Sequence, residues 1–254
     1  MTGAAIEFRD VVVTAAPSRE NREGVRILRG VSLSLEAGTT TALLGRSGSG
    51  KTTLLRTVNG LVLPTSGAVL VGGSPVNGSD LQALRRRIGY VIQETGLYPH
   101  MTIERNVAMS LELAGVAAAQ RAERATEVLR MTGLDPADFA RRMPWQLSGG
   151  QRQRAGVARA LAGDPSILLL DEPFGALDPL TRAEMQTMLR ELLSRLGKTA
   201  VIVTHDLQEA VFLAHRVLLV DAGAVIADLP SREVMRSEIP AVKAYVAAAQ
   251  RFEA

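Results

Sequence analysis

A glycine-rich run that ends in lysine and threonine is the part of this sequence best suited to chemistry. It comprises Gly45, Arg46, Ser47, Gly48, Ser49, Gly50, Lys51 and Thr52, and Thr53 follows it. The run fits the phosphate-binding pattern G-x-x-x-x-G-K-[ST] in full. Glycines let the N–H groups of such a loop turn toward an anion, and the lysine adds a compact positive charge. We therefore predict a nucleoside triphosphate site in which the hydroxyl of Thr52 suits Mg²⁺; the alternative is a plain glycine-rich turn.

Two adjacent carboxylates, Asp171 and Glu172, follow the apolar run at 167–170. A buried parallel strand with acids only at its carboxyl end delivers charge to the ligand crevice of the sheet. Neighbouring residues on a strand point in opposite directions, so we expect the two acids to play different parts. Asp171 suits the Mg²⁺ shell, and Glu172 suits a general base that polarises the attacking water. The alternative is a pair of helix-capping residues.

Strands and helices alternate along the chain and must position these residues. Apolar runs predict strands at 6–13, 31–35, 40–44, 68–71, 88–92, 167–170, 200–203 and 217–220. Helices are predicted at 51–61, 103–113, 118–131, 179–196 and 207–214, and another begins near Ser148. Ser79 and Gln82 have the spacing of a capping box that opens a short helix, and 15–24 reads as a loop. This order predicts an α/β fold with a mostly parallel sheet and one helical insertion.

A second glycine-rich helix start comprises Leu147, Ser148, Gly149, Gly150 and Gln151. Ser148 and Gln151 have capping-box spacing, and a glycine-rich helix tip with a hydroxyl is itself an anion site. With this pentapeptide the chain resembles the ABC (ATP-binding cassette) ATPase family. The resemblance implies a P-loop NTPase fold of the ABC type with an N-terminal antiparallel β part. It also implies one domain over 1–254, with a core at about 1–93 and 164–254 and an α-helical subdomain at about 94–163.

The resemblance further implies that the working unit is a head-to-tail pair of this chain with a second copy or a homologous ATPase subunit. ATP bound by one chain would be capped in trans by Ser148, Gly149, Gly150 and Gln151 of the other. Asp178, in a run similar to the family's D-loop, would cross the interface.

Gln93 and His205 match two more positions of the family, the Q-loop glutamine and the switch histidine. The implied catalytic residues are then Glu172, His205, Gln93 and Lys51. The implied metal ligands are Thr52, Gln93 and Asp171, and the cofactors are ATP and Mg²⁺. His100 and His215 match no motif, so we expect them to be surface or packing residues.

One departure from the family concerns the nucleotide base. The family places an aromatic side chain near the end of the first strand, where it stacks on adenine. Here that stretch reads Val13, Thr14, Ala15 and Ala16, and no aromatic residue lies between Phe8 and Tyr90. We therefore expect phosphate binding without base stacking of the usual kind.

Composition excludes several classes of function. The chain has no cysteine, which rules out disulfides, thiolate catalysis and cysteine-based zinc sites. Its formal net charge of +3 is spread along the chain, so no nucleic-acid partner is indicated. No apolar run reaches the roughly 20 residues that a membrane span needs. If the protein serves a membrane, we expect other chains to cross it.

The runs at 86–93, 96–102 and 171–182 are most similar to the ATP-binding subunits of glycine betaine, carnitine and choline importers. This resemblance implies permease partners, an indirect link to a solute-binding protein, and a peripheral place on the cytoplasmic face of the inner membrane. Leu97, Tyr98 and Pro99 are then candidates for permease contact; alternatively they only pack the helical insertion. Another cargo (amino acid, sulfonate or lipid), a non-transport ABC ATPase and a non-hydrolysing subunit are further alternatives, and the intact Glu172 and His205 argue against the last.

Overall fold

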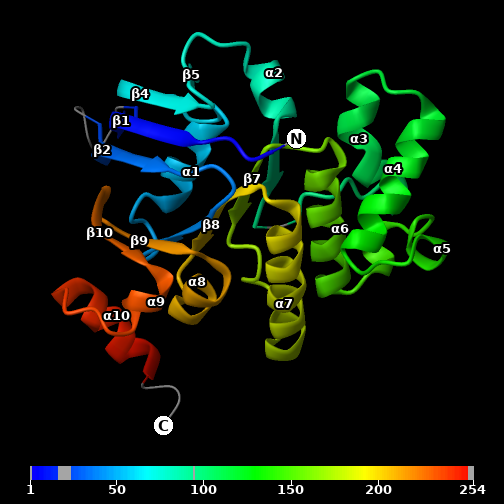
Figure 1. The fold of residues 1–254 in the computed structure, drawn as a ribbon. Coiled ribbons are helices and arrows are strands. Elements are labelled where there is room, and N and C mark those ends of the chain that lie inside the picture. Colours follow the sequence, from blue (N-terminus) through cyan, green and yellow to red (C-terminus); the bar gives the residue numbers. More distant parts are fainter. Residues whose placement is uncertain (1, 17–23, 94, 251–254) are drawn as a thin grey trace.

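A six-stranded, mainly parallel sheet forms the centre of the computed structural model, which describes residues 2–16, 24–93 and 95–250 (Figure 1). Its strand order is β10-β9-β3-β8-β7-β6, and only β10 runs antiparallel to its neighbour. The strands are β3 (Thr40–Leu44), β6 (Ile88–Val91), β7 (Ile167–Asp171), β8 (Thr199–Thr204), β9 (Arg216–Asp221) and β10 (Ala224–Pro230). Every residue of β3, β7 and β8 is buried, as expected for parallel strands covered on both faces.

A second, antiparallel sheet has the strand order β2-β1-β4-β5. Its strands are β1 (Ile6–Thr14), β2 (Arg26–Leu35), β4 (Ser66–Val71) and β5 (Ser74–Pro75). One apolar cluster joins this sheet, helix α1 (Lys51–Val58) and one face of the central sheet, including Leu43, Leu169 and Val201. Helix α1 therefore lies between the two sheets, and the apolar layers on both sides hold its N-terminal tip in place.

The other face of the central sheet is covered by helices. Alternate residues of β7 and β8, such as Leu168 and Ile202, pack with α6 (Gly149–Ala162) and α7 (Pro179–Leu196). A third cluster packs β3, β9 and β10 against α8 (Leu207–Leu213), α9 (Ser231–Val234) and α10 (Pro240–Gln250). The short α2 (Leu81–Arg86) precedes β6.

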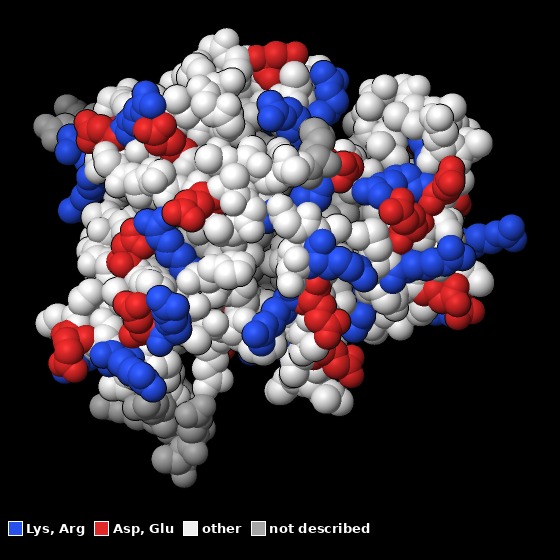
Figure 2. Space-filling view, in the orientation of Figure 1, with Lys and Arg blue, Asp and Glu red and all other residues white. Residues whose placement is uncertain are grey.

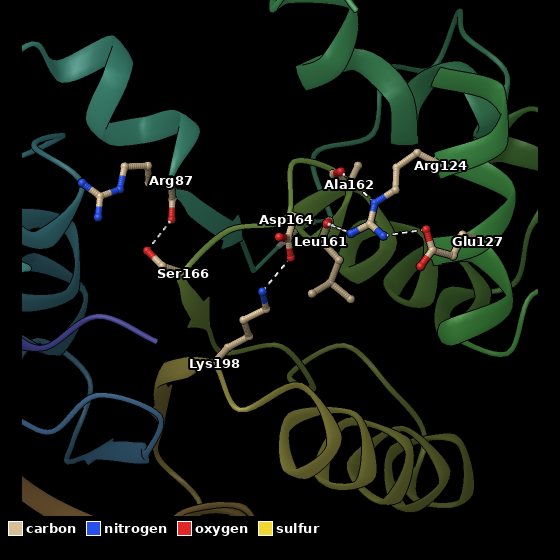
Figure 3. Close-up of polar contacts among 8 residues, drawn as sticks. All are labelled: Arg87, Arg124, Glu127, Leu161, Ala162, Asp164, Ser166 and Lys198. Atoms are coloured by element: carbon tan, nitrogen blue, oxygen red, sulfur yellow. Dashed lines mark hydrogen bonds and ion pairs between the residues drawn. The ribbon is translucent and has the colours of Figure 1, made fainter. Parts of the chain in front are cut away.

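Helices α3 (Ile103–Leu113), α4 (Ala118–Met131), α5 (Pro136–Phe139) and α6, with the 3₁₀ turn η1 (Pro144–Gln146), stand together beside the sheet (Figure 1). Arg124 of α4 fixes α6 in this group, because its guanidinium donates to the last-turn carbonyls of Leu161 and Ala162 at 3.0 Å each (Figure 3). Glu127 holds the same guanidinium at 2.6 Å. The positive charge thus lies at the negative end of the helix dipole.

A short turn then joins α6 to β7, and polar contacts hold it on both sides. The Ser166 hydroxyl donates to the Arg87 carbonyl at 3.3 Å, and Lys198 Nζ pairs with Asp164 Oδ1 at 2.6 Å (Figure 3). Asp164 itself has a left-handed φ of 47°. Because the turn is fixed, the orientation of α6 is coupled to that of β7, whose far end carries the acidic pair.

Most predicted elements are confirmed, and α3, α4 and α7 have the predicted bounds. Several details differ. The cap of α2 is Asp80, which accepts from the amides of Gln82 and Ala83, whereas Ser79 donates to the Val76 carbonyl. Helix α1 ends at Val58, and β2 begins at Arg26 and not at residue 31. The elements β5, α5, η1, β10, α9 and α10 were not predicted. The predicted loop at 15–24 falls mostly on residues 17–23, which lie outside the described residues.

Basic and acidic side chains are interspersed on the face shown in Figure 2, with uncharged areas between them. Among the helices in the described part of the chain, none is both long enough and apolar enough to span a membrane.

Candidate functional site

The tip of helix α1 is built to receive an anion. Gly50, at the N-cap, has a φ of 104°, which suits glycine, and a Cβ there would come within 3.1 Å of the Ile27 carbonyl oxygen. No side chain caps the helix, and its first turn contains no acidic residue. The N–H groups of the first turn, which have no partners within the helix, and the positive end of the helix dipole therefore face the loop at 45–50. This geometry fits a phosphate group.

Lys51 is buried, and its ammonium lies inside the loop. Nζ donates to the carbonyls of Gly45 and Arg46 at 2.8 and 2.7 Å. Burial lowers the pKa of Lys51, while the nearby charges of Glu172 and Asp171 act in the opposite direction. An incoming phosphate would add negative charge at the same point. The lysine is thus a desolvated cation held where an anion is to bind.

The hydroxyl of Thr52 and the carboxylate of Asp171 meet between α1 and β7. Thr52 Oγ1 donates to Asp171 Oδ1 at 2.7 Å, and Asp171 is buried. Both groups offer the oxygen atoms that Mg²⁺ prefers, and Mg²⁺ commonly keeps several waters and takes only one or two carboxylates. In the described residues no three His, Cys, Asp or Glu side chains gather as in an all-protein metal site. The donor set therefore fits Mg²⁺ shared with a phosphate.

Two residues that sequence reasoning missed hold the far side of the Asp171 carboxylate. Tyr90 donates its hydroxyl to Asp171 Oδ2 at 3.1 Å, and Arg56 Nε donates to the Tyr90 oxygen at 3.1 Å. Arg56 also lies 3.5 Å from Asp171 Oδ2. The i, i+4 spacing of Thr52 and Arg56 on α1 was a signal that could have found Arg56. Tyr90 lies on β6, so it links the strand before Gln93 to the carboxylate.

Glu172 leaves the strand in an unusual backbone conformation. Its φ is 46°, and its amide donates to the Val203 carbonyl at 3.0 Å. We had expected side-chain alternation along the strand to set the direction of the Glu172 side chain. The left-handed backbone conformation sets it instead. Its Oε2 lies 3.5 Å from His205 Nδ1, and the His205 side chain is 64% exposed. Such strained positions gather at functional sites.

A buried carboxylate on α8 supports the segment that carries His205. Thr204 donates its hydroxyl to Glu209 Oε2 at 2.6 Å and accepts from the Asp206 amide at 3.0 Å. Gln186 donates to the other Glu209 oxygen at 3.1 Å. Glu209 is buried, and sequence reasoning missed it too.

Burial raises the pKa of Glu209 above its ordinary 4.5, and the hydrogen bond from Thr204 partly offsets this. A carboxyl whose pKa is raised on folding contributes stability that is complete below pH 4.5 and lost as the pH rises through the folded value. Glu209→Gln cannot ionise and keeps an acceptor for Thr204. We expect its free energy of unfolding, relative to wild type, to increase as the pH rises above 4.5. Urea unfolding at several pH values measures this; a difference that does not change with pH would contradict it.

The register between β6 and β7 determines where Gln93 lies relative to the acidic pair. In the pairing of β6 with β7, Val91 is opposite Leu170, so Gln93 emerges at the edge where Asp171 and Glu172 lie. Its side chain is exposed, and among the described residues no hydrogen bond joins it to Thr52 or Asp171. His215, in contrast, is an exposed residue whose Nδ1 accepts from the Thr40 amide at 3.0 Å, which agrees with the predicted surface or packing role.

The second glycine-rich tip opens α6. Ser148 and Gln151 form the predicted capping box, with the Gln151 amide 3.3 Å from Ser148 Oγ and the Ser148 amide 3.0 Å from Gln151 Oε1. A Cβ on Gly150 would lie 2.3 Å from the Thr181 methyl group, so this position packs tightly against the start of α7. The carboxylate of Asp178 caps α7 by accepting from the Thr181 amide at 3.1 Å.

The predicted site residues thus form two groups within one chain. The loop at 45–53, Asp171, Glu172 and His205 are brought together, and the tip at 148–151 lies with Asp178. No hydrogen bond or ion pair joins the two groups within the described ranges.

Comparisons with known proteins agree on the family. The family model described as ABC transporter matches residues 28–175. The choline transport ATP-binding protein OpuBA of Bacillus subtilis is 43% identical over 82% of this chain and 55% of its own length. The osmoprotectant import ATP-binding protein OsmV of Salmonella typhimurium is 44% identical over 77% of this chain and 51% of its own length. This chain thus spans about half the length of these two relatives.

The taurine import ATP-binding protein TauB of Shigella boydii is 43% identical over 88% of this chain and 83% of its own length. Among solved structures, the dimeric ATP-binding cassette MJ0796, in a post-hydrolysis state bound to ADP and Pi, is 35% identical with a TM-score of 0.79. It covers 89% of this chain and 99% of its own. The family match and these relatives, with the two glycine-rich tips and the acidic strand end, show that the chain belongs to the ABC transporter family.

Proposed function

We propose that this chain binds and hydrolyses ATP with Mg²⁺ and thereby powers the import of a small solute. The observation that carries the proposal is the meeting of Thr52 and Asp171 at 2.7 Å, beside an uncapped helix tip and a buried lysine. Phosphoryl transfer needs little covalent help from the protein and depends on positioning and charge stabilisation. This group of residues supplies both.

Lys51 and the amides of the loop at 45–53 bind and orient the β- and γ-phosphates. Thr52 and Asp171, with Gln93 at the same edge, would hold Mg²⁺, which would neutralise charge on the phosphate oxygens. Glu172 accepts a proton from the attacking water. His205, 3.5 Å from Glu172, orients this carboxylate and contacts the γ-phosphate.

The site is completed by a second copy of the chain in head-to-tail orientation. In this arrangement the partner's tip at 148–151 presents its N–H groups to the γ-phosphate, and Asp178 lies at the interface. The separation of the two groups within one chain supports this pairing. The dimeric state of the cassette MJ0796 gives it further support.

A groove beside the Q-loop is our candidate surface for the membrane subunit. It has a volume of about 480 Å³ and is lined in part by Tyr90, Tyr98, Leu113 and Arg159. Arg159 ties it to the Q-loop by donating to the carbonyls of Thr95 and Gly96 at 2.7 and 2.6 Å. Tyr98 is 45% exposed and Leu113 80% exposed. A helix docked here would pull on the segment that follows Gln93, at the cytoplasmic face of the membrane.

Of the three candidates for this contact, Leu97 fits the alternative that we had left open. It is partly buried and packs against the core of the helical group. Tyr98 and Pro99 are exposed. We therefore assign contact with the membrane subunit to Tyr98 and Pro99.

Glycine betaine or another quaternary amine is the cargo we propose, because the choline and osmoprotectant relatives are 43% and 44% identical to the chain. Taurine is the second candidate, since the taurine relative matches over 83% of its own length.

Uptake of radiolabelled solutes tests the proposal. The gene is deleted in the source organism and restored as wild type or as Glu172→Gln, and uptake of glycine betaine, choline, carnitine and taurine is measured after osmotic upshift. We expect deletion to abolish uptake of a quaternary amine, and only the wild-type gene to restore it. Loss of taurine uptake alone would favour the second candidate. Unchanged uptake of all four solutes would contradict the role in their import.

A further inference from the structure

Trp145 is a large apolar side chain exposed beside the second glycine-rich tip. It is the chain's sole tryptophan, lies on η1 three residues before Ser148, and is 72% exposed. Three residues span at most about 10 Å, so its ring lies near the helix tip. Tryptophans are normally highly buried, and one left in solvent calls for an explanation.

The backbone that carries Trp145 is rigid. Pro144 is buried, and the Met143 amide donates to Gln146 Oε1 at 2.7 Å. Leu147 is buried on the other side, and its carbonyl accepts from Arg152 at 2.6 Å. The indole is therefore presented to solvent by a fixed turn. A ligand that contacts it incurs little cost for ordering the backbone.

The ends of β1 and β2 beside the phosphate loop carry no aromatic residue. The tip of α1 lies against β2, because a Cβ on Gly50 would approach Ile27 and Leu28 within about 3.1 Å. The end of β1 pairs with this part of β2, and Thr14 is opposite Arg26. Val25, 55% exposed, precedes Arg26. A nucleotide whose phosphates enter at Gly50 therefore meets no aromatic side chain on these ends of β1 and β2.

We propose that Trp145 stacks on the base of the ATP held by the partner copy. The inference rests on the proposed head-to-tail pair, in which the tip at 148–151 covers the γ-phosphate bound by the other chain. The nucleotide then extends from that tip along the partner's surface, and the indole, three residues before the tip, meets the base. The missing aromatic in cis is thus replaced by one in trans.

Two consequences follow from this arrangement. The base is stacked only in the closed pair, so the contact strengthens association and not the first binding of nucleotide to one chain. Stacking is tolerant of base identity, because every base offers a flat π-face. We expect a larger contribution from a purine than from a pyrimidine, because the purine ring system is larger.

The test uses three variants: Trp145→Ala, Trp145→Phe and, as a control, Met235→Ala, which truncates an exposed side chain of α9's C-cap. Each is combined with Glu172→Gln so that ATP is bound without turnover. Nucleotide binding to the single chain is measured at low protein concentration, and pair formation with ATP or CTP is measured by sedimentation. Trp145 fluorescence is followed in the Glu172→Gln single variant, which is the parent of the three double variants.

We expect the Trp145→Ala variant to bind ATP normally as a single chain but to form the ATP-bound pair about tenfold or more weakly. Trp145→Phe should recover most of the loss, Met235→Ala should show none, and the preference for ATP over CTP should shrink only in Trp145→Ala. The fluorescence of the parent should change on pair formation. Pair formation unaffected by Trp145→Ala, or an indole still exposed in the pair, would overturn this inference alone. No ATP-driven pair in the parent would overturn the head-to-tail arrangement as well.

Discussion

Glu172→Gln should lower ATP turnover by at least about a hundredfold while ATP binding is retained. The substitution preserves the size of the side chain and removes its basicity, so the attacking water loses its proton acceptor. The Thr52–Asp171 contact and the Lys51 hydrogen bonds do not involve this carboxylate and should persist. Phosphate release measures turnover, and titration with a fluorescent ATP analogue measures binding.

Because hydrolysis no longer releases the two chains, ATP-loaded Glu172→Gln should sediment as a stable pair. Glu233→Gln, which changes an exposed carboxylate on α9, is the matched control and should behave as wild type. Turnover close to wild type in Glu172→Gln would show that another group accepts the proton.

Lys51→Ala should weaken ATP binding by about a hundredfold or more, since it removes a desolvated cation and its charged hydrogen bonds to phosphate. The carbonyls of Gly45 and Arg46 also lose their donor, so a thermal melt must show that the variant is folded. Lys243→Ala is the matched control, because this lysine pairs with Glu238 on the surface. Unchanged affinity in a folded Lys51→Ala variant would contradict the assignment of the phosphate site.

Local patterns were sufficient to predict most of the elements, the phosphate loop and the acidic strand end. The strand at β7, the glycine-rich turn and α7 each have their own signal in periodicity or capping, and these signals agree with the fold. The capping box at Ser148 and Gln151 was predicted from spacing alone and is present. Where two capping residues compete, as Ser79 and Asp80 do, the sequence does not decide, and the stronger acceptor, Asp80, caps α2.

Contacts between distant segments could not be predicted in this way. Tyr90 reaches Asp171 only because β6 pairs with β7, and Glu209 supports Thr204 only because α8 folds back on the end of β8. The left-handed φ of Glu172 likewise has no signature in its residue type. These features depend on tertiary packing, which a pattern along the chain does not contain.

The measurement that tests the account most directly is ATP hydrolysis by a mixture of two inactive variants, Lys51→Ala and Ser148→Arg. Each variant alone should be inactive, because every site in its pairs lacks either the phosphate loop or the capping tip. A mixed pair has one site in which the intact loop of one chain meets the intact tip of the other. If one such site turns over independently, an equal mixture should recover about a quarter of wild-type activity. A mixture as inactive as its components, or full activity of Ser148→Arg alone, would contradict a site built from two chains.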